Sequence, residues 1–504
     1  MNSNAEKNLF RLPAPLLAAI AGATGVLGFE PVGFFPVTIG ALALLAALWR
    51  RAGSAGRAAW IGFSFGIGYF VAGISWIYVS LHDFGAMAAP LAAFLTFALA
   101  AVLAAYPAII GFVYHQAGAH TMTSTVILLP ALWTLADWIR GWLFTGFPWL
   151  AVGYSQVPLS PLAGYVPVLG VYGTTYLAAL SASLLIAVID SAGTRRVQSS
   201  IAIIVIWTAG FVLQQVAWTQ PVGTPVSVSL LQGNIAQDMK WRPDLVTPTL
   251  ETYEKLVTES RARLIVLPET ALPLFLHEVP PDYLEALASH ARGNGGDVLI
   301  GMPEFTDSEY YNSVLSFGLA PTQRYRKSHL VPFGEYIPWK LLFGWFFDVV
   351  QIPLLDFGRG GADQAPLNVA GQKVAVDICY EDVFGAEIIR QLPAATLLVN
   401  VSNVAWFGRS VAPRQHLQIS QARALETGRV MLRATNTGMT AIIDPQGRVQ
   451  NVAPEFSTAV VQGTVQGYAG ATPYVRWNDL PVLMLAALLT AGGWLAQRHR
   501  RRRR

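Results

Sequence analysis

The chain has 504 residues, of which 53% are hydrophobic and only 13% are charged. This charged share is about half of that in soluble globular proteins, which excludes a disordered chain, a coiled coil and an ordinary cytosolic enzyme. The length indicates more than one domain. The single cysteine, Cys379, excludes an internal disulfide and a cysteine-based metal cluster, so this thiol is either an inert buried group or a reactive one.

The charges divide the chain into three parts. Residues 1–217 carry 8 Lys and Arg and 5 Asp and Glu, residues 218–478 carry 20 and 24, and residues 479–504 carry 6 and 1. The middle part therefore has the charge density of a soluble, slightly acidic domain, whereas the positive excess lies in the apolar first part and in the tail. Because there is no basic stripe with interleaved aromatic residues, we expect no nucleic acid partner.

Eight apolar segments are candidates for membrane spans, since a helix needs about 20 apolar residues to cross a bilayer. The first two are short and rich in Gly and Ala, and a cleaved signal peptide is the alternative for the first. The segments predict a multi-pass α-helical membrane domain, and they lie at residues 12–29, 33–49, 58–81, 88–114, 123–142, 163–189, 198–217 and 479–497.

Clusters of basic residues flank the predicted spans on the same side of the membrane. Arginines at 50–51 follow the second span, arginines at 195–196 follow the sixth, and RHRRRRR at 498–504 ends the chain. Loops rich in Lys and Arg stay in the cytoplasm. With eight alternating spans both termini are then cytoplasmic, and residues 218–478 lie on the opposite side of the membrane.

Residues 218–478 alternate short aliphatic runs with helical patterns, which indicates an α/β domain. The runs have the length of strands buried in a sheet. Helices are predicted at 247–261 and 413–427. The predicted strands lie at 226–235, 263–269, 297–305, 310–317, 373–382, 396–403, 430–438 and 440–447.

Three strand ends in this domain carry polar residues suited to catalysis. Glu269 follows the run RLIVLP, Lys327 ends the stretch TQRYRK, and Cys379 follows VAVDI. A carboxylate at the end of a buried strand is unfavourable unless it is paired. A cysteine between a strand and a helix gains thiolate stability from the helix N-terminus. For each residue alone, a cap, a solvated lysine or a buried thiol is the simpler interpretation.

A nucleophilic thiol needs a base and a positive charge nearby. Histidine is the usual base, and among the histidines of this domain His329 and His416 stay open as partners of Cys379. A Glu with a Lys is the other solution, in which the Glu takes the proton and the Lys stabilises the thiolate and the developing oxyanion.

Several motifs resemble those of a known family. Glu269 in LPET, Lys327 in YRKSHLVPFGEYIP and Cys379 in ICYEDVF resemble the Glu-Lys-Cys triad of the nitrilase superfamily. The segments LLQGNIAQDMKW, SNVAWFG, RALETGRVMLRATNTG and GFPWLAVGYSQ are similar to segments of the bacterial apolipoprotein N-acyltransferases, its membrane-bound branch. The resemblance covers nearly the whole chain. One departure is Val404 in SNVAWFG, where the family usually has an Asp.

The resemblance implies a domain order and a location. A transmembrane domain at 1–217 precedes an extracytoplasmic nitrilase-like αββα sandwich at 218–478, and a C-terminal span with a basic cytoplasmic tail follows at 479–504. The implied location is the bacterial inner membrane, with the catalytic domain in the periplasm.

The resemblance also implies a ping-pong acyl transfer, the final step of bacterial lipoprotein maturation. Cys379 would take an acyl chain from the sn-1 position of a phospholipid, expected to be phosphatidylethanolamine, and form a thioester. The α-amino group of the S-diacylglyceryl cysteine of an apolipoprotein would then receive the chain. Glu269 would be the general base and Lys327 would stabilise the oxyanion. The supporting residues would be Glu335, Trp241, Tyr380 and Glu381.

Residues 339–357, WKLLFGWFFDVVQIPLLDF, combine few charges with many aromatic side chains. Outside the cytoplasm this composition is typical of an arm that dips into the lipid interface, and an internal hairpin is the alternative. Asp137 and Arg140, near the outer end of the fifth span, are expected to pair or to contact a lipid head group. The expected membrane-dipping residues of the arm are Phe343, Trp345, Phe346 and Phe347.

The sequence has no P-loop, dinucleotide fingerprint or metal-ligand spacing, so we expect no cofactor and no metal ion. The expected partners are membrane lipid, the phospholipid acyl donor and the diacylglyceryl apolipoprotein N-terminus, and we expect a monomer. The alternative function is a membrane-tethered nitrilase-type amidase, although one span would suffice to tether it. A transporter or receptor with an outer binding domain would leave the triad motifs unexplained.

Overall fold

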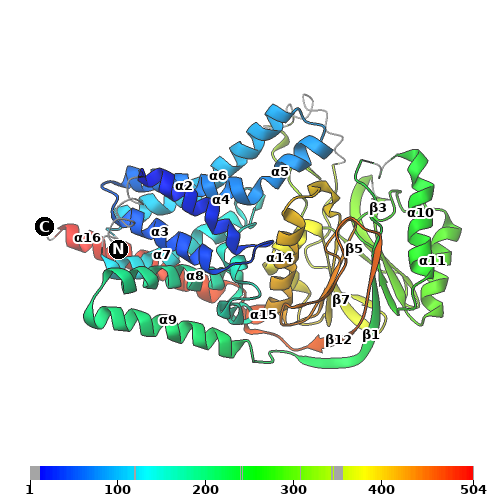
Figure 1. Cartoon of the computed structure of the whole chain (residues 1–504). Coiled ribbons are helices and arrows are strands. Elements are labelled where there is room, and N and C mark those ends of the chain that lie inside the picture. The colour runs from blue at the N-terminus through cyan, green and yellow to red at the C-terminus, as the bar shows by residue number, and fades with distance from the viewer. Residues whose placement is uncertain are drawn as a thin grey trace, which may run out of the picture. The chain divides into compact units, whose positions relative to one another are not determined.

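The computed structural model describes residues 12–118, 121–238, 240, 242–306, 308–341, 344 and 356–502. For residues 497–502 it describes the backbone alone. The chain forms two compact units (Figure 1). The first unit contains Ala88–Val216 and the segments up to Tyr78 and from Trp477 onward, and the second contains Val79–Met87 and Ala217–Arg476.

The first unit is a bundle of apolar helices. Three of them, α2 (Ala14–Gly25), α3 (Pro36–Arg50) and α16 (Leu480–Arg502), have shorter apolar stretches and match the first two and the last of the predicted spans. Within the described part of the chain, five helical segments are long and apolar enough to cross a membrane. They are α4 (Ala55–Ile74), α6 (Ala89–Gln116), α7 (Met122–Arg140), Pro161–Asp190, which includes α8 (Val166–Asp190), and α9 (Gly193–Leu213).

The multi-pass α-helical membrane domain is therefore confirmed, and the span count is approximate. The span boundaries differ from their predictions by a few residues. The seventh span matters most, because α9 begins at Gly193 and not at residue 198, so the arginines at 195–196 lie in its first turn. The end of α3 contacts the end of α8, where Arg50 Nη1 lies 2.6 Å from Asp190 Oδ2.

Small residues let α4 pack closely against its neighbours. A Cβ added at Gly66 would lie 2.6 Å from the Cα of Ala104 in α6, and one added at Gly68 would lie 1.9 Å from the carbonyl oxygen of Ala19 in α2. Close van der Waals packing of this kind is what drives helix association in a bilayer. Apolar side chains such as Phe94 and Ile204 stay exposed on the outside of the bundle, which suits contact with lipid.

The Asp137–Arg140 ion pair lies inside this unit. Asp137 Oδ1 is 2.9 Å from Arg140 Nη2, and both side chains are buried. Arg140 also donates to the carbonyl oxygens of Phe147 and Trp149, and Asp137 accepts the main-chain N–H of Val152. The pair thus holds the GFPWLAVGYSQ segment against α7. The expectation of pairing is confirmed, and contact with a lipid head group stays a prediction.

The second unit contains two six-stranded sheets. The strands of the first sheet are β1 (Gln220–Gln232), β2 (Leu264–Val266), β3 (Asp297–Thr306), β4 (Glu309–Gly318), β5 (Arg324–Arg326) and β12 (Ala459–Ala469). Those of the second sheet are β6 (Leu367–Val369), β7 (Gln372–Ile378), β8 (Leu397–Ser402), β9 (Met431–Thr435), β10 (Ala441–Ile443) and β11 (Val449–Val452).

The two sheets share one design. Their orders are β12-β1-β2-β3-β4-β5 and β11-β10-β9-β8-β7-β6. The central strands β1, β2 and β3 are parallel, as are β7, β8 and β9, whereas the outer pairs are antiparallel. Parallel strands that are covered on both faces have continuous aliphatic sequences, which is why the sequence predicted these central strands.

Helices cover the outer face of each sheet. Figure 1 shows α10 (Pro243–Thr258) and α11 (Pro281–Gly293) on one side of the sheets and α14 (Ala412–Thr427) on the other. Between the sheets, aliphatic side chains such as Val228, Val376 and Val399 form a core that excludes water. Leu287 of α11 and Leu417 of α14 belong to the two outer clusters. The αββα sandwich is therefore confirmed.

All eight predicted strands occur, with shifted ends. Strand β5 corresponds to the expected strand stretch that ends at Lys327. The sequence did not predict β6, β11, β12 or α11. Strand β6 is short and exposes its middle residue, and β11 is mostly exposed, so neither has the aliphatic run that marks a buried strand. The predicted strand at 373–382 ends at Ile378, because a 3-10 helix begins at Cys379 and runs to Val383.

Replacement of Gly66 by Ala is expected to destabilise the helical unit by about 1–3 kcal/mol, because the added Cβ overlaps Ala104. Gly40→Ala is the matched control, since its Cβ meets no atom within 4 Å and alanine favours the helix by about 0.5–1 kcal/mol. Thermal unfolding in detergent measures both. Equal melting temperatures for Gly66→Ala and the parent chain would contradict the packing described.

Candidate active site

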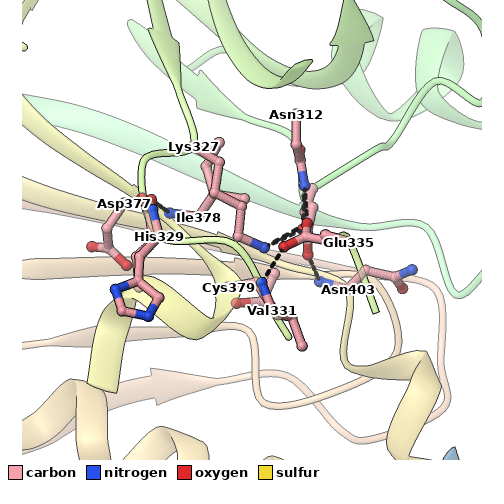
Figure 2. A network of polar contacts seen from close by, with 12 residues as sticks. Asn312, Lys327, His329, Val331, Glu335, Asp377, Ile378, Cys379 and Asn403 are labelled. Carbon is pink, nitrogen blue, oxygen red and sulfur yellow. Dashed lines mark hydrogen bonds and ion pairs between the residues drawn. The ribbon is translucent and has the colours of Figure 1, made fainter. Parts of the chain in front are cut away.

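Lys327 and Cys379 lie where strands of both sheets end (Figure 2), and Glu269 lies 3.4 Å from the Lys327 Nζ. Glu269 follows β2 by three residues, Lys327 directly follows β5, and Cys379 directly follows β7. In parallel sheets the crevice outside the carboxyl ends of the strands is the usual place for a binding site. The charges of Glu269 and Lys327 are also among those that act most strongly on the Cys379 thiol.

Lys327 lies between two carboxylates. Its Nζ donates to Glu335 Oε1 at 2.8 Å and to Glu269 Oε1 at 3.4 Å, and its side chain is 1% exposed. Burial by itself lowers the pKa of Lys327, but the two carboxylates outweigh burial and raise it above its ordinary value. Lys327 therefore stays positively charged, and it holds both acids in one place.

Glu269 is held as an ionised carboxylate. Its Oε1 accepts a hydrogen bond from Asn312 Nδ2 at 2.7 Å, and its Oε2 accepts the main-chain N–H of Asn403 at 2.7 Å. Burial raises the pKa of Glu269, but Lys327 and these two donors outweigh burial and keep the pKa below its ordinary value. Glu269 is therefore ready to accept a proton at neutral pH.

Glu335 shares its donors with Glu269. Asn312 Nδ2 lies 3.1 Å from Glu335 Oε1, and the main-chain N–H of Val331 donates to Glu335 Oε2 at 2.8 Å (Figure 2). The main chain of Glu335 also turns back onto Val331, with an N–H to carbonyl distance of 2.9 Å. Glu335 thus closes its own turn and also contacts Lys327, so it is both a turn carboxylate and a residue of the site.

Cys379 has a strained main chain and a protonated thiol. Its φ of 55° lies in the left-handed region, which residues other than glycine rarely adopt and which often marks a functional turn. Burial and then the negative charge of Glu269 raise the pKa of the Cys379 thiol, and Lys327 opposes them only in part. The sequence predicted a helix whose N-terminus would favour the thiolate. The structure has a 3-10 helix of five residues at this point, and the pKa of the thiol is raised and not lowered.

Glu381 ties the nucleophile turn to the lysine segment. It is buried, and its carboxylate accepts the main-chain N–H groups of Ile378, Ser328 and His329 at 2.7, 2.6 and 3.0 Å. Burial raises the pKa of Glu381, while these N–H groups lower it in part. Because Ile378 precedes Cys379 and Ser328 follows Lys327, Glu381 fixes the distance between the nucleophile and the lysine.

Neither histidine is placed as the base. His329 Nδ1 is 3.1 Å from Glu387 Oε1, and its ring stacks on Phe384. His416 is buried beside the main chain of Cys379, and burial and then Arg433 hold its pKa well below the ordinary value. The structure therefore favours the other solution left open by the sequence, a Glu with a Lys.

Of the remaining predicted residues, Trp241, Tyr380 and those of the arm, the structure describes only some. The ring of Tyr380 packs edge-on against Phe384, with the centroids 5.2 Å apart. At the two ends of the predicted arm, Lys340 pairs with Asp356, and the N–H of Phe357 donates to the Glu335 carbonyl at 3.0 Å. Trp241 and the four predicted membrane-dipping residues lie outside the described residues, namely Phe343, Trp345, Phe346 and Phe347.

Sequence reasoning missed three residues of this site. Asn312 is a buried amide in β4, and a polar residue within the run YYNSVLSF was the available signal. Asn403 lies in SNVAWFG but contributes its main-chain N–H, which no side chain reveals. Lys240 donates to the carbonyl oxygen of Glu269 at 3.3 Å. Val404, the departure from the family motif, is buried next to Asn403. With valine at this position the main-chain N–H of Asn403 still donates to Glu269.

Replacement of Asn312 by Ala is expected to raise the pKa of Glu269, since a donor to the ionised form is lost. The rate of Cys379 alkylation by iodoacetamide falls in acid as Glu269 becomes protonated, and this fall (the acid limb) then moves to higher pH. Stability falls by about 1.5–3 kcal/mol, the value of a hydrogen bond to a charged group. Asn451→Ala, which removes an exposed amide, is the control and leaves the limb in place. An unmoved limb in Asn312→Ala would show that Glu269 does not depend on this donor.

Comparisons with known proteins identify the family of the chain. The apolipoprotein N-acyltransferase N-terminal domain model matches residues 21–184, and the carbon-nitrogen hydrolase model matches residues 227–474. Apolipoprotein N-acyltransferases of Nitrosomonas europaea and Chromobacterium violaceum are 56% and 46% identical to the chain, each over 95% of it and over 97% and 94% of their own lengths. With this identity over nearly its full length, the chain belongs to the apolipoprotein N-acyltransferase family.

Proposed function

We propose that Cys379 carries the acyl chain in a ping-pong transfer from a phospholipid to the α-amino group of an apolipoprotein. Membership of the family makes the chain an acyltransferase with lipoprotein and phospholipid substrates. The observation that carries the mechanism is the buried contact of Lys327 with Glu269 and Glu335, whose charges act on the Cys379 thiol. This arrangement supplies a nucleophile, an ionised base and a fixed cation.

In the first step the Cys379 thiol gives its proton to Glu269, and the sulfur attacks the ester carbonyl carbon of the phospholipid. The carbonyl oxygen becomes an oxyanion, which Lys327 stabilises. The C–O bond then breaks, and the leaving alkoxide takes the proton from Glu269. The products are a Cys379 thioester and a lysophospholipid. We expect the sn-1 ester of phosphatidylethanolamine to be the donor.

In the second step the α-amino group of the S-diacylglyceryl cysteine attacks the thioester carbonyl carbon. Glu269 takes a proton from the attacking nitrogen, and Lys327 again stabilises the oxyanion. The C–S bond breaks, and the sulfur of Cys379 recovers the proton from Glu269. The product is the N-acylated lipoprotein, and the enzyme returns to its starting protonation state.

The position of Lys327 couples these proton transfers to oxyanion stabilisation. In the resting site its charge is shared between Glu269 and Glu335. When Glu269 takes the thiol proton, this carboxyl becomes neutral and attracts Lys327 less strongly. The ammonium group is then available to the oxyanion at the moment when that negative charge forms, which is the condition for differential stabilisation of a transition state.

The two lipid substrates give the apolar unit a function. A soluble enzyme would meet acyl chains held in a bilayer only rarely, whereas a multi-pass membrane unit keeps the site at the membrane. We infer a location in the inner membrane, with the catalytic unit in the periplasm, from the arginines after the second and sixth predicted spans and in the tail. The predicted arm, with Trp345 and Phe346, would add contact with the lipid interface.

Incubation of the purified protein with phosphatidylethanolamine is expected to add one acyl chain to Cys379, since no second cysteine competes for it. Intact mass spectrometry detects the adduct. Addition of a diacylglyceryl peptide then removes the adduct and yields N-acylated peptide. Cys379→Ser forms no thioester and serves as the control.

Two outcomes would contradict this mechanism. One is full transferase activity in Cys379→Ser. The other is a thioester that water resolves to free fatty acid at the same rate with or without the peptide, which would support the alternative amidase-type chemistry.

Replacement of Lys327 by Met is expected to lower the rate of thioester formation at least about a hundredfold. It also leaves Glu269 and Glu335 facing each other without a cation, which costs about 3 kcal/mol of stability or more. This loss is largest at neutral pH and shrinks in acid, because protonation of the carboxyls removes their repulsion. Rates and melting temperatures across pH measure both effects.

The matched control is Lys373→Met, which changes an exposed lysine on β7, the strand that leads to Cys379. Rapid thioester formation by a folded Lys327→Met protein would refute the oxyanion role of Lys327. A stability loss that does not depend on pH would refute the repulsion between Glu269 and Glu335.

A further inference from the structure

A second lysine is buried beside the proposed base. Lys240 lies in the segment between β1 and α10, and its side chain is 2% exposed. Its Nζ donates to the main-chain carbonyl oxygen of Glu269 at 3.3 Å. Among the described residues no carboxylate lies within ion-pair distance of the Lys240 Nζ. The two carboxylates of the site, those of Glu269 and Glu335, pair with Lys327 instead. A buried ammonium without a paired carboxylate is costly, so its position calls for a reason.

The charges of the site supply that reason. Lys327 is one positive charge between two negative ones, so Glu269, Glu335 and Lys327 together carry a net charge of minus one. Attack by the thiol would place a further negative charge, on the sulfur or on the oxyanion, next to Glu335. Arg433 also acts on the thiol, but Asp382 lies 3.4 Å from this guanidinium and offsets its charge.

We propose that Lys240 is the second cation of the active site, which keeps the buried cluster neutral while the thiolate and the oxyanion form. With Lys240 protonated, two lysines balance two carboxylates in the resting site. After the thiol proton has moved to Glu269, the same two lysines balance Glu335 and the reacting sulfur or oxygen. The proposal rests on the proposed function in taking Glu269 as the base, and it adds a role for a residue outside the triad.

The electrostatics of Lys240 agree with this role. Burial lowers the pKa of Lys240 to about 8, while the negative charges of Glu269 and Cys379 oppose this change in part. Lys240 is therefore charged below about pH 8 and loses its charge above it. The other charged groups on its own segment are Asp238 and an exposed ion pair of Arg242 with Asp244.

The loss of this charge is expected to slow the reaction at alkaline pH, which we call the alkaline limb. As pH rises through about 8, Lys240 becomes neutral, the cluster returns to a net negative charge, and thioester formation slows. Arginine stays charged at all accessible pH values. In Lys240→Arg the slowing is therefore expected to move to much higher pH, whereas a lysine that only packs the loop would leave the alkaline limb unchanged.

The test uses the full-length protein in detergent, with Lys240→Met, Lys240→Arg and the control Lys255→Met, which changes an exposed lysine of α10. The first readout is alkylation of Cys379 by iodoacetamide, in which the thiol loses its proton, the sulfur bonds to carbon and iodide leaves. At pH 7 we expect Lys240→Met to react about tenfold more slowly than the parent chain, and Lys240→Arg to recover most of the rate. Lys255→Met reacts like the parent chain.

The second readout is the rate of thioester formation with phosphatidylethanolamine between about pH 6 and 10. The parent chain slows above about pH 8, and Lys240→Arg does not. Equal alkylation rates for Lys240→Met and the parent chain would overturn the proposal, as would an unshifted alkaline limb in Lys240→Arg. The Lys240→Arg result decides the matter even where Lys240→Met fails to fold.

Alkylation separates this proposal from the proposed function, because iodoacetamide reports on the thiol whether or not phospholipid is the donor. If Glu269→Gln is alkylated as fast as the parent chain while Lys240→Met is alkylated slowly, the base role of Glu269 is refuted and the cation role of Lys240 is supported. If Glu269→Gln is alkylated slowly and Lys240→Met is not, the base role of Glu269 is supported and the cation role of Lys240 is refuted.

Discussion

The contact of the Lys327 ammonium with the carboxylates of Glu269 and Glu335 is the interaction on which the rest of the active site depends. Three charges are buried together, and such a cluster is stable only where the remaining lone pairs also find donors. Asn312 serves both carboxylates, and the main-chain N–H groups of Asn403 and Val331 complete them. These donors come from both sheets, so the αββα sandwich is needed to build the site, and a disturbance of either sheet would leave a buried charge without its partners.

The same cluster explains why the thiol rests in its protonated form. Burial of Cys379, together with the charges of Glu269 and Glu335, outweighs Lys327 and Arg433, so the pKa of the thiol is raised, not lowered. Glu269 remains ionised because Lys327 and its hydrogen bonds favour the charged form. In the mechanism that we propose, the sulfur becomes a nucleophile only when Glu269 takes its proton. A resting thiol that is activated only by its neighbour would suit the proposed thioester, which forms with one lipid and waits for a second lipid substrate, and the proposed role of Lys240 completes the balance of charges.

The sequence predicted the fold where its pattern is set by burial. The central parallel strands appear as aliphatic runs, whereas β6 and β11 are too short or too exposed to leave a pattern. Glu269, Lys327 and Cys379 were found because side-chain chemistry and motif spacing mark them. The N–H of Asn403 was not, since any residue can supply a main-chain group. The protonated thiol was also not predicted, because the balance of burial and charge around Cys379 depends on distances that the sequence does not contain.

The central claim is that Lys327 keeps Glu269 ionised in a buried site. The most direct measurement is a pH titration of carboxyl bands by difference infrared spectroscopy, with the Glu269→Gln protein as the reference that isolates this group. The account predicts a carboxylate band for Glu269 at neutral pH that converts to the protonated form only below the ordinary glutamate value of 4.5. A protonated carboxyl band for Glu269 at neutral pH in the resting enzyme would contradict the account, because a protonated Glu269 could not accept the thiol proton.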